Sequence, residues 1–184
     1  LIFIWSTTPL AVVLSIKDLH PIWALACRFA LAAPLSALCL KLLGEHLPLT
    51  KKAMRSYVAG TLSLFGAMIF TYLGAAYLPS SLISLLFGLS PLMVGILAHT
   101  VFKTQFLRLE QWLGLLVSFL GLIVIFSHGS QGQAQSLGIV FVLLGVSCYV
   151  ASVFWVKHEN ANLHPLAQTT GSLVLSSLAM FLVL

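Results

Sequence analysis

The amino-acid sequence predicts an all-α fold, a polytopic transmembrane bundle of about seven helices. Three observations predict it. Charged residues make up 7% of the 184 residues and apolar residues 60%, whereas soluble domains carry about 25% charged residues. The mean hydropathy is +1.07. The apolar residues also form continuous runs, which excludes a β-barrel because barrel strands alternate polar and apolar residues.

Seven runs approach or reach the roughly 20 residues that a helix needs to cross a bilayer. The first run is long enough only in part. In chain order, the predicted spans are Leu1–Ile16, Pro21–Leu42, Tyr57–Leu78, Leu82–Phe102, Leu109–Phe126, Leu137–Val156 and Pro165–Leu184.

The connections between these runs justify where each span ends. Every charged residue except Arg28 lies in or beside a connection, and two connections, at Pro79 and at residues 128–135, hold no charge. Seven basic residues fall on one side of the predicted bundle: Lys41, Lys51, Lys52, Arg55, Lys103, Arg108 and Lys157. The opposite side holds only Lys17, beside Asp18. Because basic loops stay cytoplasmic, we expect a multi-pass protein of the cell (inner) membrane with a cytoplasmic N-terminus.

Several function classes do not fit the composition. The net charge of +5 comes from these loops, so nucleic-acid binding is not expected. The three cysteines lie in apolar runs and form no disulfide framework. The six histidines have no metal-site spacing, and no nucleophile elbow or phosphate-binding glycine loop is present. We therefore expect no enzyme and no cofactor; the expected partners are a small-molecule substrate and the lipid bilayer, with a homodimer left open.

The chain repeats a short motif with a shift of 144 residues. Leu19-His20-Pro21 falls on Leu163-His164-Pro165, and Trp5 falls on Tyr149. The two copies are five helices apart. Because five is an odd number, the copies insert into the membrane with opposite orientations. Inverted repeats are a recurrent plan of secondary transporters, whose substrate site lies near the membrane midplane. The chain also starts without methionine and stops inside an apolar run, which predicts a piece of a longer protein.

Three stretches carry a resemblance to a known family. They are Trp5-Ser6-Thr7-Thr8-Pro9 with the later Pro21 and Cys27-Arg28-Phe29; Ala75–Leu78 with Ser80–Leu86 and Ser90-Pro91-Leu92; and Trp112-Leu113-Gly114 through Phe119-Leu120-Gly121. In these stretches the chain resembles the EamA-type transporter family of the drug/metabolite transporter superfamily.

The resemblance implies ten helices in two inverted five-helix repeats. Residues 1–127 would form the first repeat, and residues 136–184 the start of the second. The chain departs from the family in one place. Such proteins usually place a Gly-Glu pair just after the fourth helix, where this chain reads Phe102-Lys103-Thr104-Gln105.

Arg28 is the first candidate substrate-binding residue because it lies within a predicted span. It stands about seven residues into its helix, roughly 10 Å below the outer boundary. An unpaired arginine near the bilayer centre costs at least about 2.5–3.5 kcal/mol. It would attract an anionic substrate; alternatively, it bonds backbone carbonyls of a neighbouring helix or reaches outward to the interface. No carboxylate lies within a predicted span, so exchange of cationic drugs for protons is not expected.

Ser90 and Pro91 are candidates because proline disrupts a helix. Pro91 cannot donate to the carbonyl of Phe87, and a free carbonyl in a bilayer is tolerated only where a neighbour or cavity water satisfies it. A kink that lines the transport path would meet this condition. Ser80, Ser84 and Gly88 recur every fourth residue, a spacing typical of close helix packing.

Trp5, Tyr72 and Tyr149 complete the candidate substrate-binding set. They lie deeper in their spans than Trp23, Tyr77 and Trp155, which are close to helix ends, and a tyrosine hydroxyl at that depth needs a polar partner. Two hypotheses follow from the sequence. The first is a secondary transporter, an exporter or permease, that moves small polar metabolites or drug-like compounds by alternating access. The second is a membrane scaffold or an inactive transporter copy.

Overall fold

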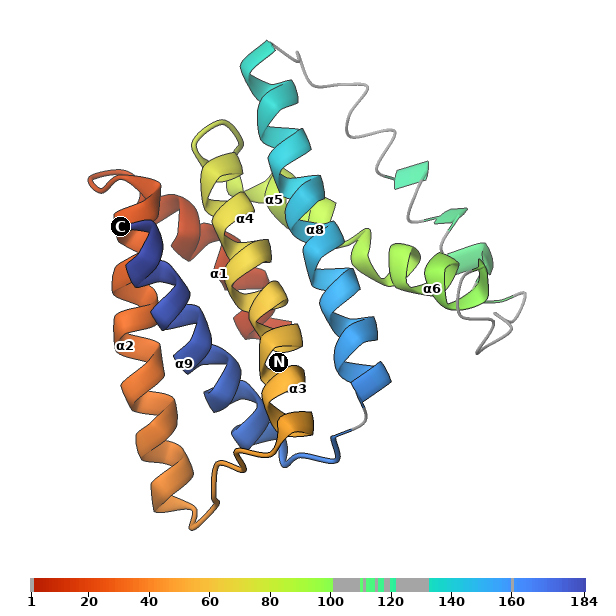
Figure 1. Ribbon diagram of the computed structural model, residues 1–184. Coiled ribbons are helices and arrows are strands. Elements are labelled where there is room, and N and C mark those ends of the chain that lie inside the picture. Colours follow the sequence, from red (N-terminus) through yellow and green to blue (C-terminus); the bar gives the residue numbers. More distant parts are fainter. Residues whose placement is uncertain are drawn as a thin grey trace.

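The computed structural model describes residues 2–100, 110, 112–114, 116, 117, 120, 121, 133–159 and 161–184. Throughout these residues the regular secondary structure is helical (Figure 1), which confirms the predicted all-α class. The helices are α1 (Ile2–Ser15), α2 (Pro21–Leu42), α3 (Lys51–Thr61), a π-helical turn η1 (Leu62–Gly66), α4 (Ala67–Ala75), α5 (Ser80–Phe87), α6 (Ser90–Thr100), α8 (Gln133–Glu159) and α9 (Pro165–Val183).

Five described segments are long and apolar enough to cross a membrane: Pro21–Leu42, Lys51–Ala75, Ser80–His99, Gln135–Glu159 and Pro165–Val183. The second predicted span has the bounds of α2. The predicted span Leu82–Phe102 differs, because it is divided into α5 and α6. The predicted span Leu109–Phe126 lies largely outside the described residues.

The two His-Pro motifs begin two helices in the same way. His20 precedes α2 with φ −58° and ψ 139°, and His164 precedes α9 with φ −59° and ψ 136°. In both helices proline occupies the first helical position, where its missing N–H costs nothing. The repeated sequence therefore has a repeated backbone conformation.

Helices α2 and α9 pack against each other in opposite directions (Figure 1). The Thr170 hydroxyl near the start of α9 donates to the Ser36 carbonyl in the second half of α2, at 3.3 Å. At the other end, Trp23 and Ala26 of α2 line one groove with Met180 and Phe181 of α9. The two helices that carry the repeated motif are thus antiparallel.

One long helix, Lys51–Ala75, runs through the middle of the bundle as α3, η1 and α4. The Thr50 hydroxyl caps its start by accepting from the Ala53 amide at 3.2 Å. The π-helical turn η1 widens the helix near its midpoint, and such turns often occur at functional sites.

Helices α4 and α8 approach closely because glycines form their contact surface. A Cβ atom at Gly145 would lie 2.9 Å from the Ala67 carbonyl oxygen, and one at Gly74 would lie 3.0 Å from the Gly138 carbonyl oxygen. Small residues at such positions let helix backbones approach in a membrane. Beside this contact lies an apolar core that includes Leu25, Phe29, Ile83, Val142 and Val146.

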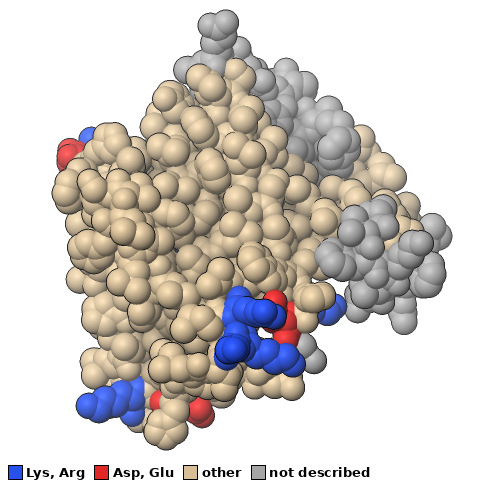
Figure 2. Space-filling view, in the orientation of Figure 1, with Lys and Arg blue, Asp and Glu red and all other residues tan. Residues whose placement is uncertain are grey.

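Charged side chains gather along one end of the molecule in Figure 2, with a small acidic and basic group at the opposite end. Lys41 lies in the last turn of α2, Lys51 and Lys52 begin α3, and Lys157 lies in the last turn of α8. These helix ends share one end of the bundle in Figure 1. Apart from the exposed Arg28 on α2, the described part of the chain therefore has an apolar belt between charged ends, as expected of a multi-pass membrane protein.

Candidate functional site

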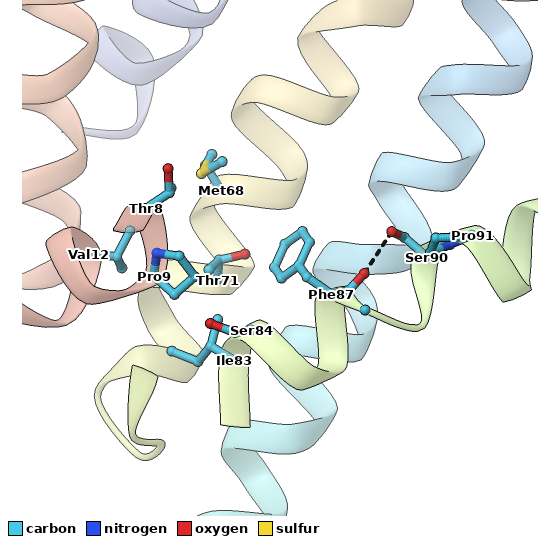
Figure 3. A pocket seen from close by; sticks show the side chains of 11 residues that line it. Thr8, Pro9, Val12, Met68, Thr71, Ile83, Ser84, Phe87, Ser90 and Pro91 are labelled. Atoms are coloured by element: carbon cyan, nitrogen blue, oxygen red, sulfur yellow. Dashed lines mark hydrogen bonds between the residues drawn. The ribbon is translucent and has the colours of Figure 1, made fainter. Parts of the chain in front are cut away.

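A cavity of about 290 Å³ opens between α1, α4, α5 and the start of α6 (Figure 3). Its walls come from helices that are far apart in the sequence. The lining residues are Thr8, Pro9, Val12, Met68, Thr71, Ile83, Ser84, Phe87, Gly88, Ser90 and Pro91.

The cavity forms at this point because Pro91 interrupts a helix. Helix α5 ends at Phe87, and α6 begins at Ser90. Pro91 has no N–H to donate to the Phe87 carbonyl, and the Ser90 hydroxyl donates to that oxygen instead, at 2.7 Å (Figure 3). The amides of Gly88 and Leu89 donate to the carbonyls of Ser84 and Leu86 at 3.0 and 3.1 Å. The break is therefore stabilised by its own hydrogen bonds.

Three hydroxyl groups in the cavity wall share one arrangement. Thr71 donates to the Ala67 carbonyl at 2.6 Å, and Ser84 donates to the Ser80 carbonyl at 2.9 Å. Ser90 donates to Phe87, as described above. Each hydroxyl hydrogen is engaged by the chain itself, while the oxygen lone pairs remain able to accept hydrogen bonds.

Apart from Thr8, the rest of the cavity wall is apolar or small. Val12, Met68, Ile83 and Phe87 supply hydrocarbon surface, and Pro9 and Pro91 have no backbone N–H. Among the described residues, those that line this cavity include no acidic or basic side chain.

A second cavity, of about 310 Å³, lies between α3, η1, α8 and α9. Its lining residues are Gly60, Ser63, Leu64, Ser152, Val153, Val156, Gln168, Thr169 and Ser172. A polar network forms its base. The Ser56 hydroxyl donates to Gln168 Oε1 at 2.7 Å, Gln168 Nε2 donates to the Ser56 carbonyl at 2.8 Å, and the Ser152 hydroxyl donates to the Ala59 carbonyl at 2.6 Å.

The structure brings together two of the residues that the sequence singled out. Ser90 and Pro91 both line the first cavity. Arg28 is exposed on α2 and is not among the lining residues of that cavity.

The predicted aromatic residues lie elsewhere. Tyr72 is buried in the apolar core, and Tyr149 packs against the same core from α8 while partly exposed. Trp5 belongs to α1, and its side chain falls outside the described part of the chain.

Sequence reasoning missed Thr8, Thr71 and Ser84 as lining residues. Ser84 belonged to a spacing typical of helix packing, and nothing in the sequence distinguished its hydroxyl from that of a packing serine. Pro9 carried a usable signal, since it is a proline within a helix like Pro91.

Comparisons with known proteins identify a family and related transporters. The EamA-like transporter family matches residues 1–127. An uncharacterized transporter of Archaeoglobus fulgidus is 25% identical over 177 residues, covering 96% of this chain and 62% of that protein. The uncharacterized transporter YyaM of Bacillus subtilis is 26% identical over 165 residues, covering 86% of this chain and 53% of that protein. The chain thus spans less than two thirds of the length of either relative. No solved structure gives a significant match.

Proposed function

The chain belongs to the EamA-like transporter family, and from this we propose that it is part of a secondary transporter that moves small molecules across the membrane by alternating access. One observation carries the proposal. The first cavity lies inside the family-matched segment, between α1, the helix Lys51–Ala75 and the helix Ser80–His99, which Pro91 divides into α5 and α6. A pocket at a discontinuous membrane helix is the usual place for a transporter's substrate.

Alternating access is supported by the antiparallel packing of α2 and α9. A shift of 144 residues carries Ser36 to Met180 and Thr170 to Ala26. Ser36 and Thr170 share a hydrogen bond at one end of the interface, and Ala26 and Met180 line one groove at the other end. The shift of 144 residues therefore exchanges one end of the α2–α9 interface with the other end. This is expected of two inverted copies that are related by an axis in the membrane plane.

The two cavities also correspond under the same shift. Thr8, Pro9 and Val12 line the first cavity, and residues 144 positions later, Ser152, Val153 and Val156, line the second. The helix Lys51–Ala75 contributes to both, with Met68 and Thr71 in the first and Gly60 and Ser63 in the second. Eleven residues, or about 16 Å, separate Gly60 from Thr71 along the helix axis. We propose that the cavities serve opposite sides of the membrane, with η1 in the wall of the second.

We propose that the end bearing Lys41, Lys51, Lys52 and Lys157 is cytoplasmic, because basic residues accumulate on that side of bacterial-type inner membranes. The start of α1 then faces the cytoplasm, and the turn that holds Lys17 and Asp18 faces the other side.

Blocking the first cavity tests the function. The full-length protein, with its native cysteines replaced, would be reconstituted into liposomes, and uptake of labelled nucleosides, amino acids and neutral amides would be measured. We expect uptake of at least one class above protein-free liposomes, and its loss when a bulky thiol reagent modifies Ser84→Cys. Leu49→Cys is the control because Leu49 is exposed in the connection before α3 and lines neither cavity. No uptake, or uptake that survives modification of Ser84→Cys, would contradict the proposal.

A further inference from the structure

Resting on the proposed transport function, we propose that the first cavity binds uncharged molecules that donate hydrogen bonds and discriminates against carboxylates. The expected ligand has a small apolar body with an N–H or O–H group. This assigns a substrate class to a cavity that the family match leaves open.

The first reason is the direction of the hydrogen bonds in the cavity wall. Thr71, Ser84 and Ser90 donate their hydroxyl hydrogens to the carbonyls of Ala67, Ser80 and Phe87, at 2.6 to 2.9 Å. A hydroxyl has one hydrogen and two lone pairs. In this arrangement, each of these side chains offers an acceptor to the cavity and no hydrogen.

Two backbone donors in the break are engaged as well: the amides of Gly88 and Leu89 bond to the carbonyls of Ser84 and Leu86. Pro9 and Pro91 have no amide hydrogen. A ligand carboxylate needs donors, and these residues do not provide them, whereas a ligand amide or alcohol finds hydroxyl oxygens able to accept.

The composition of the cavity wall supports the same class of ligand. Of the described residues that line the cavity, none is acidic or basic, and Val12, Met68, Ile83 and Phe87 make much of the surface apolar. A carboxylate that enters such a site loses hydration without gaining an ion pair, and this desolvation is costly. A neutral donor loses much less and gains one or two hydrogen bonds.

The side chains in Figure 3 show where a ligand would lie. The Phe87 ring and Thr71 lie between α1 and the break at Ser90, while Ser84 and Ile83 project from α5 below them. Ser84 is exposed, so its hydroxyl oxygen is the most accessible acceptor. An aromatic or aliphatic ligand body would pack against Phe87 and Met68.

Three ligands that share a phenyl ring distinguish a preference for hydrogen-bond donors from a preference for anions. They are benzamide, N,N-dimethylbenzamide and benzoate. Benzamide donates two N–H groups, the dimethyl compound has the same carbonyl without a donor, and benzoate is an anion. Binding to the full-length protein in detergent would be measured from thermal stabilisation. We expect benzamide to bind about tenfold more tightly than the dimethyl compound, as one neutral hydrogen bond allows. We expect benzoate to bind about a hundredfold more weakly than benzamide.

Ser84→Ala provides a residue-level test. It should reduce the preference for benzamide over the dimethyl compound to about twofold or less, because the exposed acceptor is lost. Ser147→Ala is the matched control, since Ser147 makes the same bond to a carbonyl one turn back, that of Leu143 at 2.8 Å, away from the cavity. It should leave the preference unchanged.

Equal binding of the two amides, tighter binding of benzoate, or no binding of any of the three at millimolar concentration would overturn the inference. Transport is measured separately, as counterflow in proteoliposomes. Benzamide binding without any transport would refute the proposed function while leaving the donor preference intact. Transport with a preference for benzoate would refute the donor preference while leaving the proposed function intact.

Discussion

The hydrogen bond from Ser90 to Phe87 gives the sharpest prediction about the helix break. Pro91 removes the amide that would normally bond the Phe87 carbonyl, and the Ser90 hydroxyl replaces it at 2.7 Å. In Ser90→Ala the carbonyl loses this replacement. A buried acceptor without a partner costs about 1–3 kcal/mol; this bond is partly buried, so we expect Ser90→Ala to lower the free energy of unfolding by about 1–2 kcal/mol.

Pro91→Ala changes the expected cost of the serine substitution. An alanine at position 91 brings back the amide hydrogen, which then bonds the Phe87 carbonyl as in a continuous helix. Ser90→Ala should therefore cost less than about 0.5 kcal/mol when made together with Pro91→Ala. The coupling energy of the double-mutant cycle is then about 1–2 kcal/mol.

The cycle would be measured by denaturant unfolding of the four full-length proteins in detergent micelles. Ser147→Ala serves as the control, because its hydroxyl bonds a carbonyl in an uninterrupted helix and is exposed. We expect this control to change stability by less than about 0.5 kcal/mol. An equal cost of Ser90→Ala with proline or alanine at position 91 would refute the account of the break.

Three further predictions concern packing, the polar network and Arg28. Gly145→Ala should lower the free energy of unfolding by about 1–3 kcal/mol, because the new Cβ would lie 2.9 Å from the Ala67 carbonyl oxygen. Gly114→Ala is the control, since a Cβ there would meet no described neighbour within 4 Å. Equal losses of stability in the two variants would contradict the close α4–α8 contact. Gln168→Ala should cost about 1–3 kcal/mol, because the Ser56 hydroxyl and carbonyl both lose their partner; an unchanged unfolding midpoint would show that the network contributes nothing. Arg28→Ala should leave benzamide affinity within about twofold, since Arg28 does not line the cavity; loss of binding in a folded protein would place Arg28 in the substrate path.

The sequence predicted the helix bounds best where proline or charge marks an end. α2 has the predicted bounds Pro21–Leu42, and α9 begins at the predicted Pro165. Between such marks the runs are apolar on every face, so the sequence carries little information about which side of a helix faces its neighbours. The exposed position of Arg28 on α2 and the burial of Tyr72 could not be read from periodicity for this reason.

The cavity was predictable only at the proline. The position of Pro91 identifies the carbonyl that loses its amide, and the structure shows that Ser90 supplies the new donor. The other wall comes from Thr8 and Thr71, whose helices meet α5 only in the folded chain. No local pattern joins residues so far apart, and their hydroxyls look like those of ordinary packing residues.

The most direct test of the transport account is reciprocal access to the two cavities. Ser84→Cys reports on the first cavity and Val153→Cys, 37% exposed, on the second. Each would be placed in the full-length protein without its native cysteines and labelled in liposomes by a membrane-impermeant maleimide, with and without substrate. Leu49→Cys, 73% exposed in the connection before α3 and lining neither cavity, is the control. The account predicts that substrate lowers labelling at one position, raises it at the other and leaves position 49 unchanged. Parallel changes at both positions, or no change at either, would contradict it.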